Sequence, residues 1–100
     1  MVARIWHGAV RREKADEYFA LLRDVGLSDY NRTPGNQASY VLKRNEGDVV
    51  HFVLLSIWDS LESIKTYAGN DVDVPRYTDF DADYLIELEP RVAHYSVTYE

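Results

Sequence analysis

The chain has 100 residues, of which 46% are hydrophobic and 28% charged, a composition typical of one globular domain rather than a disordered segment. Its net charge of −6, with 11 scattered basic residues, excludes the basic stripe that nucleic-acid binding requires and disfavours an anionic membrane surface. The absence of cysteine excludes disulfides and thiolate chemistry. With no leader-like start and no membrane-length apolar run, we expect one cytoplasmic domain over residues 1–100.

The first half of the chain predicts a strand, a helix and a turn. Residues 2–10 are rich in β-branched and aromatic side chains, which favour a strand. A helix of about three turns follows the polar pair at 11–12, because the next apolar residues repeat with helical spacing. Gly26 predicts the end of this helix, and Thr33-Pro34-Gly35 predicts a firm stop before the next strand.

A hairpin forms the centre of the predicted fold. Residues 36–44 read as a strand, residues 45–48 as a tight loop, and Val49–Trp58 as a second strand. In Val49–Trp58 only His51 and Ser56 are polar, and they point to opposite faces. A strand that is apolar on both faces must be covered on both faces.

The last part of the chain completes a β-α-β-β-α-β order. A helix begins at Asp59 or Ser60 and ends at Gly69, an acidic connection covers residues 70–83, a short helix covers 81–88, and the last strand covers 91–99. Right-handed crossovers then give an α+β, ferredoxin-like antiparallel sheet in the order 4-1-3-2, with both helices on one face. The other face is left bare and apolar, so we expect a homodimer through that open sheet face.

Three histidines are candidates for chemistry. His7, His51 and His94 fall near the same end of the predicted sheet, an arrangement that can hold zinc if they share a face. No carboxylate spacing supports a metal, so we expect none. His7 alone is the stronger candidate, as an acid, a base or a hydrogen-bond donor in a pocket. The alternative is that each histidine is simply a hydrogen-bonded, partly buried side chain.

An aromatic set suggests a cavity between helices and sheet. Tyr67 lies on the helix stripe that faces the sheet, and Tyr77 lies in a loop that can roof the same space. Arg76, beside Tyr77, can meet an anionic or phenolate ligand. Alternatively, the aromatic residues simply fill the core and an interface. Arg76 would then form an ion pair at the surface. The aromatic candidates are Tyr40, Trp58, Tyr67, Tyr77 and Tyr84.

Several short motifs together resemble the antibiotic biosynthesis monooxygenase (ABM) superfamily. The motifs are Ala3-Arg4-Ile5-Trp6-His7-Gly8, Thr33-Pro34-Gly35, Ile57-Trp58-Asp59-Ser60 and Tyr67-Ala68-Gly69. The resemblance covers essentially the whole chain and implies a dimeric α/β barrel of ferredoxin-like protomers. It also implies one of two chemistries: cofactor-independent oxygenation of electron-rich phenols, or oxidative haem degradation. The haem-degrading members use an asparagine, a tryptophan and a histidine, and those positions correspond here to His7, Tyr67 and Tyr77, none of which matches.

The sequence therefore predicts a cofactor-independent monooxygenase that acts on a small aromatic or phenolic substrate, with neither cofactor nor metal. We expect His7 and Tyr77 to be catalytic. We expect the substrate to be bound by Tyr67, Trp58, Arg76 and Tyr40. The alternative is a non-catalytic dimeric barrel that binds a small metabolite, and haem degradation is a weaker third hypothesis.

Overall fold

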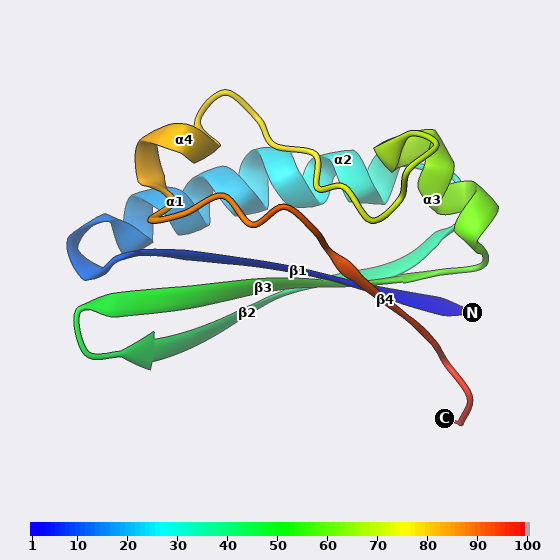
Figure 1. Ribbon diagram of the computed structural model, residues 1–100, viewed down its shortest axis with the longest axis horizontal. Coiled ribbons are helices and arrows are strands. Elements are labelled where there is room, and N and C mark those ends of the chain that lie inside the picture. The colour runs from blue at the N-terminus through cyan, green and yellow to red at the C-terminus, as the bar shows by residue number, and fades with distance from the viewer. Residues whose placement is uncertain (100) are drawn as a thin grey trace.

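The computed structural model describes residues 1–99 and shows a four-stranded antiparallel sheet whose helices all lie on one face (Figure 1). The sheet order is β2-β3-β1-β4, which confirms the predicted α+β ferredoxin-like class and the predicted order. The strands are β1 (Val2–Arg11), β2 (Asn36–Glu46), β3 (Val49–Trp58) and β4 (Ala93–Ser96). The helices are α1 (Ala15–Leu21), α2 (Leu27–Arg32), α3 (Leu61–Ala68) and α4 (Asp81–Tyr84), with a 3-10 turn η1 (Arg12–Lys14) and a π turn η2 (Leu22–Gly26).

On the two central strands, the side chains that face the helices are buried, and the side chains that face away from them are half-buried. Along β3, Phe52, Leu54 and Trp58 are buried beneath the helices, whereas the residues between them are half-buried on the other side of the sheet. Strand β1 alternates in the same way, with Trp6 and Val10 in the core. We call the side without helices the open sheet face. Because side chains alternate along a strand, each position on β1 and β3 belongs to one face only.

The first helical region is longer than predicted. Gly26 does not end a helix, because its φ of −61° is helical and α2 follows it directly. The buried side chains Tyr18, Leu22 and Tyr30 all face the sheet. In a regular α-helix, the twelve residues from Tyr18 to Tyr30 would rotate about 120° away from the same face. The wider π turn absorbs this rotation, so that one long helical segment covers the sheet.

The C-terminal elements are shorter than predicted. Helix α4 ends at Tyr84 rather than at residue 88, because Leu85 turns to an extended conformation and buries its side chain in the core. Leu85 pairs with Val10, and the Ile86 N–H donates to the Ala9 carbonyl at 2.8 Å. Residues 85–89 therefore run beside the second half of β1, and β4 pairs only with its first half, from Val2 to Ile5.

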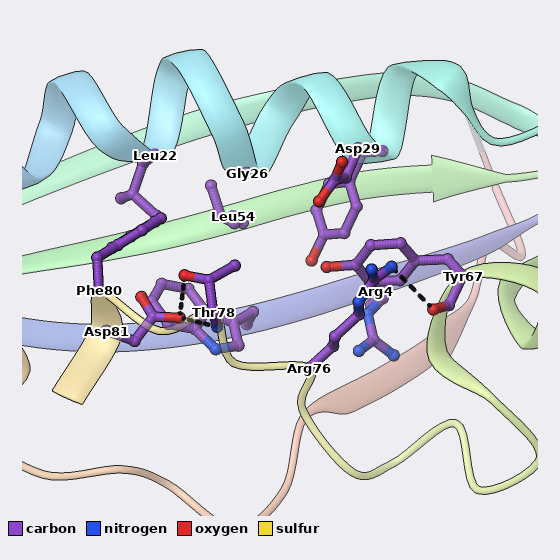
Figure 2. Close-up of a pocket in the computed structure, with 12 residues that line it drawn as sticks. Arg4, Leu22, Gly26, Asp29, Leu54, Tyr67, Arg76, Thr78, Phe80 and Asp81 are labelled. Atoms are coloured by element: carbon purple, nitrogen blue, oxygen red, sulfur yellow. Dashed lines mark hydrogen bonds between the residues drawn. The ribbon is translucent and has the colours of Figure 1, made fainter.

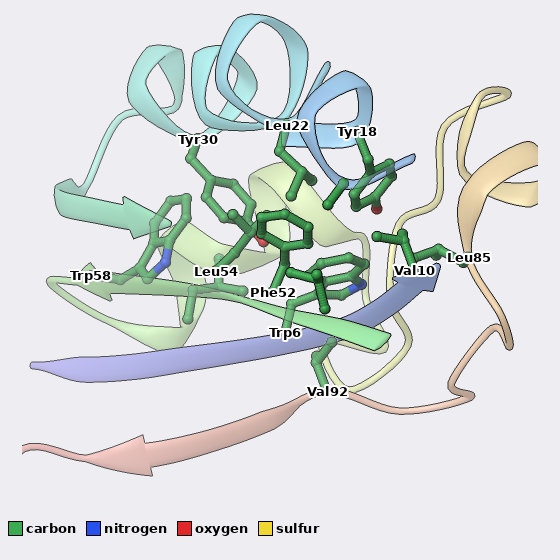
Figure 3. Close-up of a cluster of buried hydrophobic side chains, with 13 residues drawn as sticks. Trp6, Val10, Tyr18, Leu22, Tyr30, Phe52, Leu54, Trp58, Leu85 and Val92 are labelled. Atoms are coloured by element: carbon green, nitrogen blue, oxygen red, sulfur yellow. The ribbon is translucent and has the colours of Figure 1, made fainter. Parts of the chain in front are cut away.

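The core lies between the helical layer and the sheet, as Figure 3 shows. At one end of it, Trp58 is fully buried and packs edge-on against Tyr30, with 5.9 Å between ring centroids. The Trp58 indole N–H donates to Ser56 Oγ at 2.9 Å, and Ser56 is also fully buried. This bond satisfies the polar groups of both side chains inside the core.

We expect Ser56→Ala to lower the free energy of unfolding by about 1–3 kcal/mol, because the Trp58 indole N–H would stay buried without an acceptor. Urea denaturation measures this change. The matched variants are Trp58→Phe and the double variant, which removes both partners and should cost less than the sum of the two single changes. Strictly additive costs would show that the bond contributes nothing.

Candidate functional site

The structure divides the predicted site residues between the two faces of the sheet. Trp58, Tyr67 and Arg76 lie on the helix side, whereas His7 and Tyr40 lie on the open sheet face. Tyr40 is 53% exposed there. The parity of β1 turns the His7 side chain away from the pocket of Tyr67. The expectation that His7 and Tyr67 converge on one ligand therefore does not match the geometry.

A small pocket lies between the helices and the sheet, where the predicted cavity was placed (Figure 2). Its polar end is formed by Arg4, Tyr30, Tyr67 and Arg76, and its other end by residues of α4 and of the connection before it. Its volume of about 30 Å³ is on the scale of a water molecule. We call it the helix-face pocket.

Arg4 is the most unusual side chain of this pocket, because it is a cation that is only 1% exposed. Its Nη1 donates to the Val72 carbonyl at 2.6 Å and to His94 Nε2 at 2.9 Å. Its Nε is a buried polar atom that finds no hydrogen-bond partner among the described residues. Among residues 1–99, none of its hydrogen bonds goes to a carboxylate, although Asp29 and Asp81 also line the pocket.

His94 is held neutral beside Arg4. Burial lowers the pKa of the His94 imidazole, and the neighbouring Asp73 opposes that shift only in part. Since arginine can only donate, His94 Nε2 must accept, and the ring proton therefore sits on Nδ1, which donates to Asp73 at 2.9 Å. His94 therefore orients the Arg4 guanidinium as a neutral hydrogen-bond acceptor and adds no second positive charge beside it.

The two tyrosines of the pocket stay protonated at neutral pH. Burial raises the pKa of the Tyr67 phenol, and the adjacent Tyr30 phenol raises it further. Burial likewise raises the pKa of Tyr30, whose ring meets Tyr67 edge-on at 4.7 Å. The guanidinium of Arg4 lies 5.7 Å from the Tyr67 ring centre, and that of the exposed Arg76 lies 5.1 Å from it. The phenols are therefore hydrogen-bond donors rather than bases.

Trp58 and Tyr77 lie beside the pocket rather than in its lining. Trp58 packs against Tyr67 with 6.4 Å between ring centroids, so it supports the pocket wall from the core. The Tyr77 hydroxyl donates to the Glu89 carbonyl at 2.6 Å, which ties the connection before α4 to residues 85–89. Burial raises the pKa of Tyr77, and the nearby carboxylate of Glu89 adds to this effect.

The open sheet face carries a second polar arrangement. Four side chains form a continuous row of hydrogen bonds: Glu89 meets His7 Nδ1 at 2.8 Å, His7 Nε2 meets His51 Nδ1 at 2.9 Å, and His51 Nε2 meets Glu46 at 2.9 Å. We call these four residues the imidazole row. A hollow of about 270 Å³ opens beside it, lined by both histidines and by Glu46, Glu87 and Glu89.

The three histidines do not form a metal site together. His94 lies on the helix side with Arg4, whereas His7 and His51 lie on the open sheet face. Within residues 1–99, no group of three or more histidine, aspartate or glutamate side chains is arranged to hold a metal ion.

Sequence reasoning missed the burial of Arg4, the role of Tyr30 and the two glutamates of the imidazole row. For Arg4 a signal existed, because it shares its strand parity with Trp6 and Val10. Glu89 carried no such signal, since its contact with His7 depends on how residues 85–89 leave α4. In the part of the chain that the structure describes, no helix is long and apolar enough to cross a bilayer.

The fold of this chain is similar to that of solved proteins of the ABM type. A putative antibiotic biosynthesis monooxygenase from Nitrosomonas europaea superposes with a TM-score of 0.74 at 18% identity, covering 99% of this chain and 100% of the other. Rv0793 from Mycobacterium tuberculosis superposes with a TM-score of 0.68 at 17% identity over 99% and 96% of the two chains. A MhuD variant with two manganese protoporphyrin IX molecules bound per active site superposes with a TM-score of 0.63 at 13% identity, over 100% and 97%.

No protein-family model and no curated sequence matches the chain. The structural similarities confirm the ABM-like fold that the sequence motifs implied. At these identities the similarity concerns the fold, and the chemistry must be argued from the residues of this chain.

We expect acid to destabilise the protein partly through His94. Its pKa is lowered in the folded state, so on acidification the unfolded chain takes up this proton first, near the ordinary histidine value of about 6.5. Stability from this group is therefore complete above that pH and is lost as the pH falls toward the folded-state pKa. Urea denaturation at about pH 7.5 and pH 5 should show a smaller pH-dependent loss for His94→Gln than for wild type. Equal losses would contradict this assignment.

Proposed function

We propose that the chain is a cofactor-independent monooxygenase whose small aromatic or phenolic substrate binds as an anion in the helix-face pocket. The observation that carries this proposal is the buried guanidinium of Arg4, which lies beside Tyr67 and bonds to no carboxylate within residues 1–99. A buried cation without a counter-ion is costly, and an anionic ligand would offset that cost. The ABM-like fold supports the same reading.

The chemistry requires only that the site favour the substrate anion. A ring methylene that is conjugated through aromatic rings with a carbonyl, as in anthrone, loses a proton to solvent and gives an electron-rich, phenolate-type anion that reduces dioxygen directly. One oxygen atom becomes the new carbonyl, and the other leaves as water with the two methylene hydrogens. Arg4 stabilises the anion, which is a preorganised electrostatic contribution. Tyr67 and the exposed Arg76 would hold the substrate ring and its oxygen.

The pocket must widen to accept a ring. Its present volume of about 30 Å³ suits a water-sized group, and its outer wall comes from the connection between α3 and α4. At Arg76 this wall is held by a long hydrogen bond to the Tyr67 carbonyl at 3.5 Å, whereas at Val72 the same connection is held by the shorter bond from Arg4. We propose that this connection moves outward when substrate binds. Tyr77, which anchors it to Glu89, is then a positioning residue, and Trp58 supports the inner wall.

His7 and Tyr40 take no part in this proposed chemistry. Both lie on the open sheet face, on the far side of the sheet from Arg4. We propose instead that this face packs against a second copy of the chain. Its residues include the half-buried Ile5, Val53, Leu55 and Ile57 and the exposed Tyr40, Leu42 and Tyr95. An apolar surface of this kind is normally covered in a soluble protein.

Light scattering should give a mass twice the 11.6 kDa of one chain. Leu55→Glu should yield a monomer, because it places a charge in the middle of the apolar face. Leu61→Glu is the matched control, since Leu61 is exposed on the helix layer and should leave the mass unchanged. A wild-type monomer at micromolar concentration would contradict the proposal.

Oxygen uptake with anthrone tests the proposed activity. We expect Arg4→Met to reduce kcat by about 100-fold, since the developing anion loses its buried positive charge. The matched control is Arg23→Met, which removes an exposed arginine that pairs with Asp24 away from the pocket. Circular dichroism serves as the check that both variants are folded. Uptake by Arg4→Met at the wild-type rate would overturn the role of Arg4.

The alternative function is non-catalytic binding of a small metabolite. The observation that favours it is that Tyr30 and Tyr67, the phenols of the pocket, are held protonated and so supply no base. Thermal stabilisation by phenolic ligands without any product would support this alternative. The similarity to the MhuD variant makes haem a ligand to include, and a Soret shift on adding haemin would favour it over a phenol. An unchanged haemin spectrum would exclude haem.

A further inference from the structure

The imidazole row contains more hydrogen bonds than two neutral histidines can supply. Its three contacts involve four ring nitrogens and two carboxylates. Each contact needs one proton, because a lone pair facing another lone pair is repulsive and an ionised carboxylate can only accept. Two neutral imidazoles carry two protons in total. The complete row therefore holds a third.

The ring geometry places the third proton between the two histidines. The ring centroids of His7 and His51 are 5.1 Å apart with planes inclined by 26°, and His7 Nε2 lies 2.9 Å from His51 Nδ1. The rings thus meet nitrogen to nitrogen. Glu89 and Glu46 hold the outer nitrogens, so each ring presents its remaining nitrogen to the other.

We infer that the imidazole row is a binding site for one proton, which His7 and His51 share across the contact between His7 Nε2 and His51 Nδ1. The two flanking carboxylates favour the positive charge and fix the tautomers of both rings. This site lies on the opposite side of the sheet from the helix-face pocket, and it does not depend on the proposed oxygenase activity.

The carboxylates of the row are positioned by contacts that do not require the shared proton. Glu46, at the end of β2, also accepts from Arg44 at 3.4 Å. The backbone of Glu89 is anchored by the Tyr77 hydroxyl. Loss of the shared proton would therefore leave the two outer bonds intact and would break only the central bond, because the facing lone pairs of His7 and His51 repel.

The shared proton sets the charge of the hollow beside the row. Glu46, Glu87 and Glu89 line that hollow, and no lysine or arginine of the described residues does, so the histidine pair is the source of positive charge there. Lys43 and Arg44 line a separate hollow of about 250 Å³ on the β2 side of the same two histidines. When the proton leaves, the first hollow becomes more negative by one charge. The electrostatics of this end of the open sheet face therefore depend on pH.

Nitrogen-15 NMR of the wild-type protein, titrated from about pH 5 to pH 9, tests the site directly. We expect His7 Nε2 and His51 Nδ1 to change together at one pH, while His7 Nδ1 and His51 Nε2 stay protonated throughout. His94 is the internal control, since it lies on the other face and should titrate separately. Two independent steps for His7 and His51, or loss of protons from the outer nitrogens, would overturn the inference.

A double-mutant cycle of His7→Leu and His51→Leu provides a second test. We expect a coupling of about tenfold in the unfolding equilibrium constant near pH 6, falling below about twofold near pH 9 where the central bond is lost. The control cycle of His51→Leu with His94→Leu should show no coupling at either pH. A coupling that does not change with pH would overturn the inference. Loss of the coupling on adding a chelator would also overturn it, by identifying a metal ion as the occupant.

Discussion

The alternation of side chains along the two central strands is the constraint on which the rest of this structure depends. Strands β1 and β3 pair over ten residues, so every position is committed to one of two faces. The helix side receives Trp6, Phe52 and Trp58, and the open sheet face receives the histidines of the imidazole row. Two chemically distinct environments thus lie back to back, separated by the thickness of one sheet.

Each environment is organised around a positive charge. On the helix side, the charge is the permanent guanidinium of Arg4, which is buried and bonded to a neutral histidine and a carbonyl. On the open sheet face, it is the exchangeable proton that we assign to His7 and His51, between two carboxylates. In the described part of the chain no carboxylate bonds to Arg4, which is why we propose an anionic ligand there, whereas the two histidines already contact carboxylates that favour a titratable positive charge.

The sheet order followed from sequence because it depends on element order and the handedness of crossovers, which local patterns reveal. The ends of the helices and strands could not be predicted from local patterns in the same way. Gly26 looks like a helix terminator, yet burial of Tyr30 against the sheet carries the helix through it by a π turn. The short helix near residue 81 ends early because burial of Leu85 beside Val10 outweighs local helical preference.

The sequence by itself determined the fold class, the core strand Val49–Trp58, the position of Tyr67 on the helix stripe that faces the sheet and the absence of thiol chemistry. Only the tertiary structure decided which candidates meet. It separated His7 from Tyr67, buried Arg4 in contact with the Val72 carbonyl and His94, and brought Glu89 to His7 across 82 positions of chain. The physical reason is that residue type and periodicity fix which face a side chain takes, while contacts between distant segments depend on how the connecting loops pack.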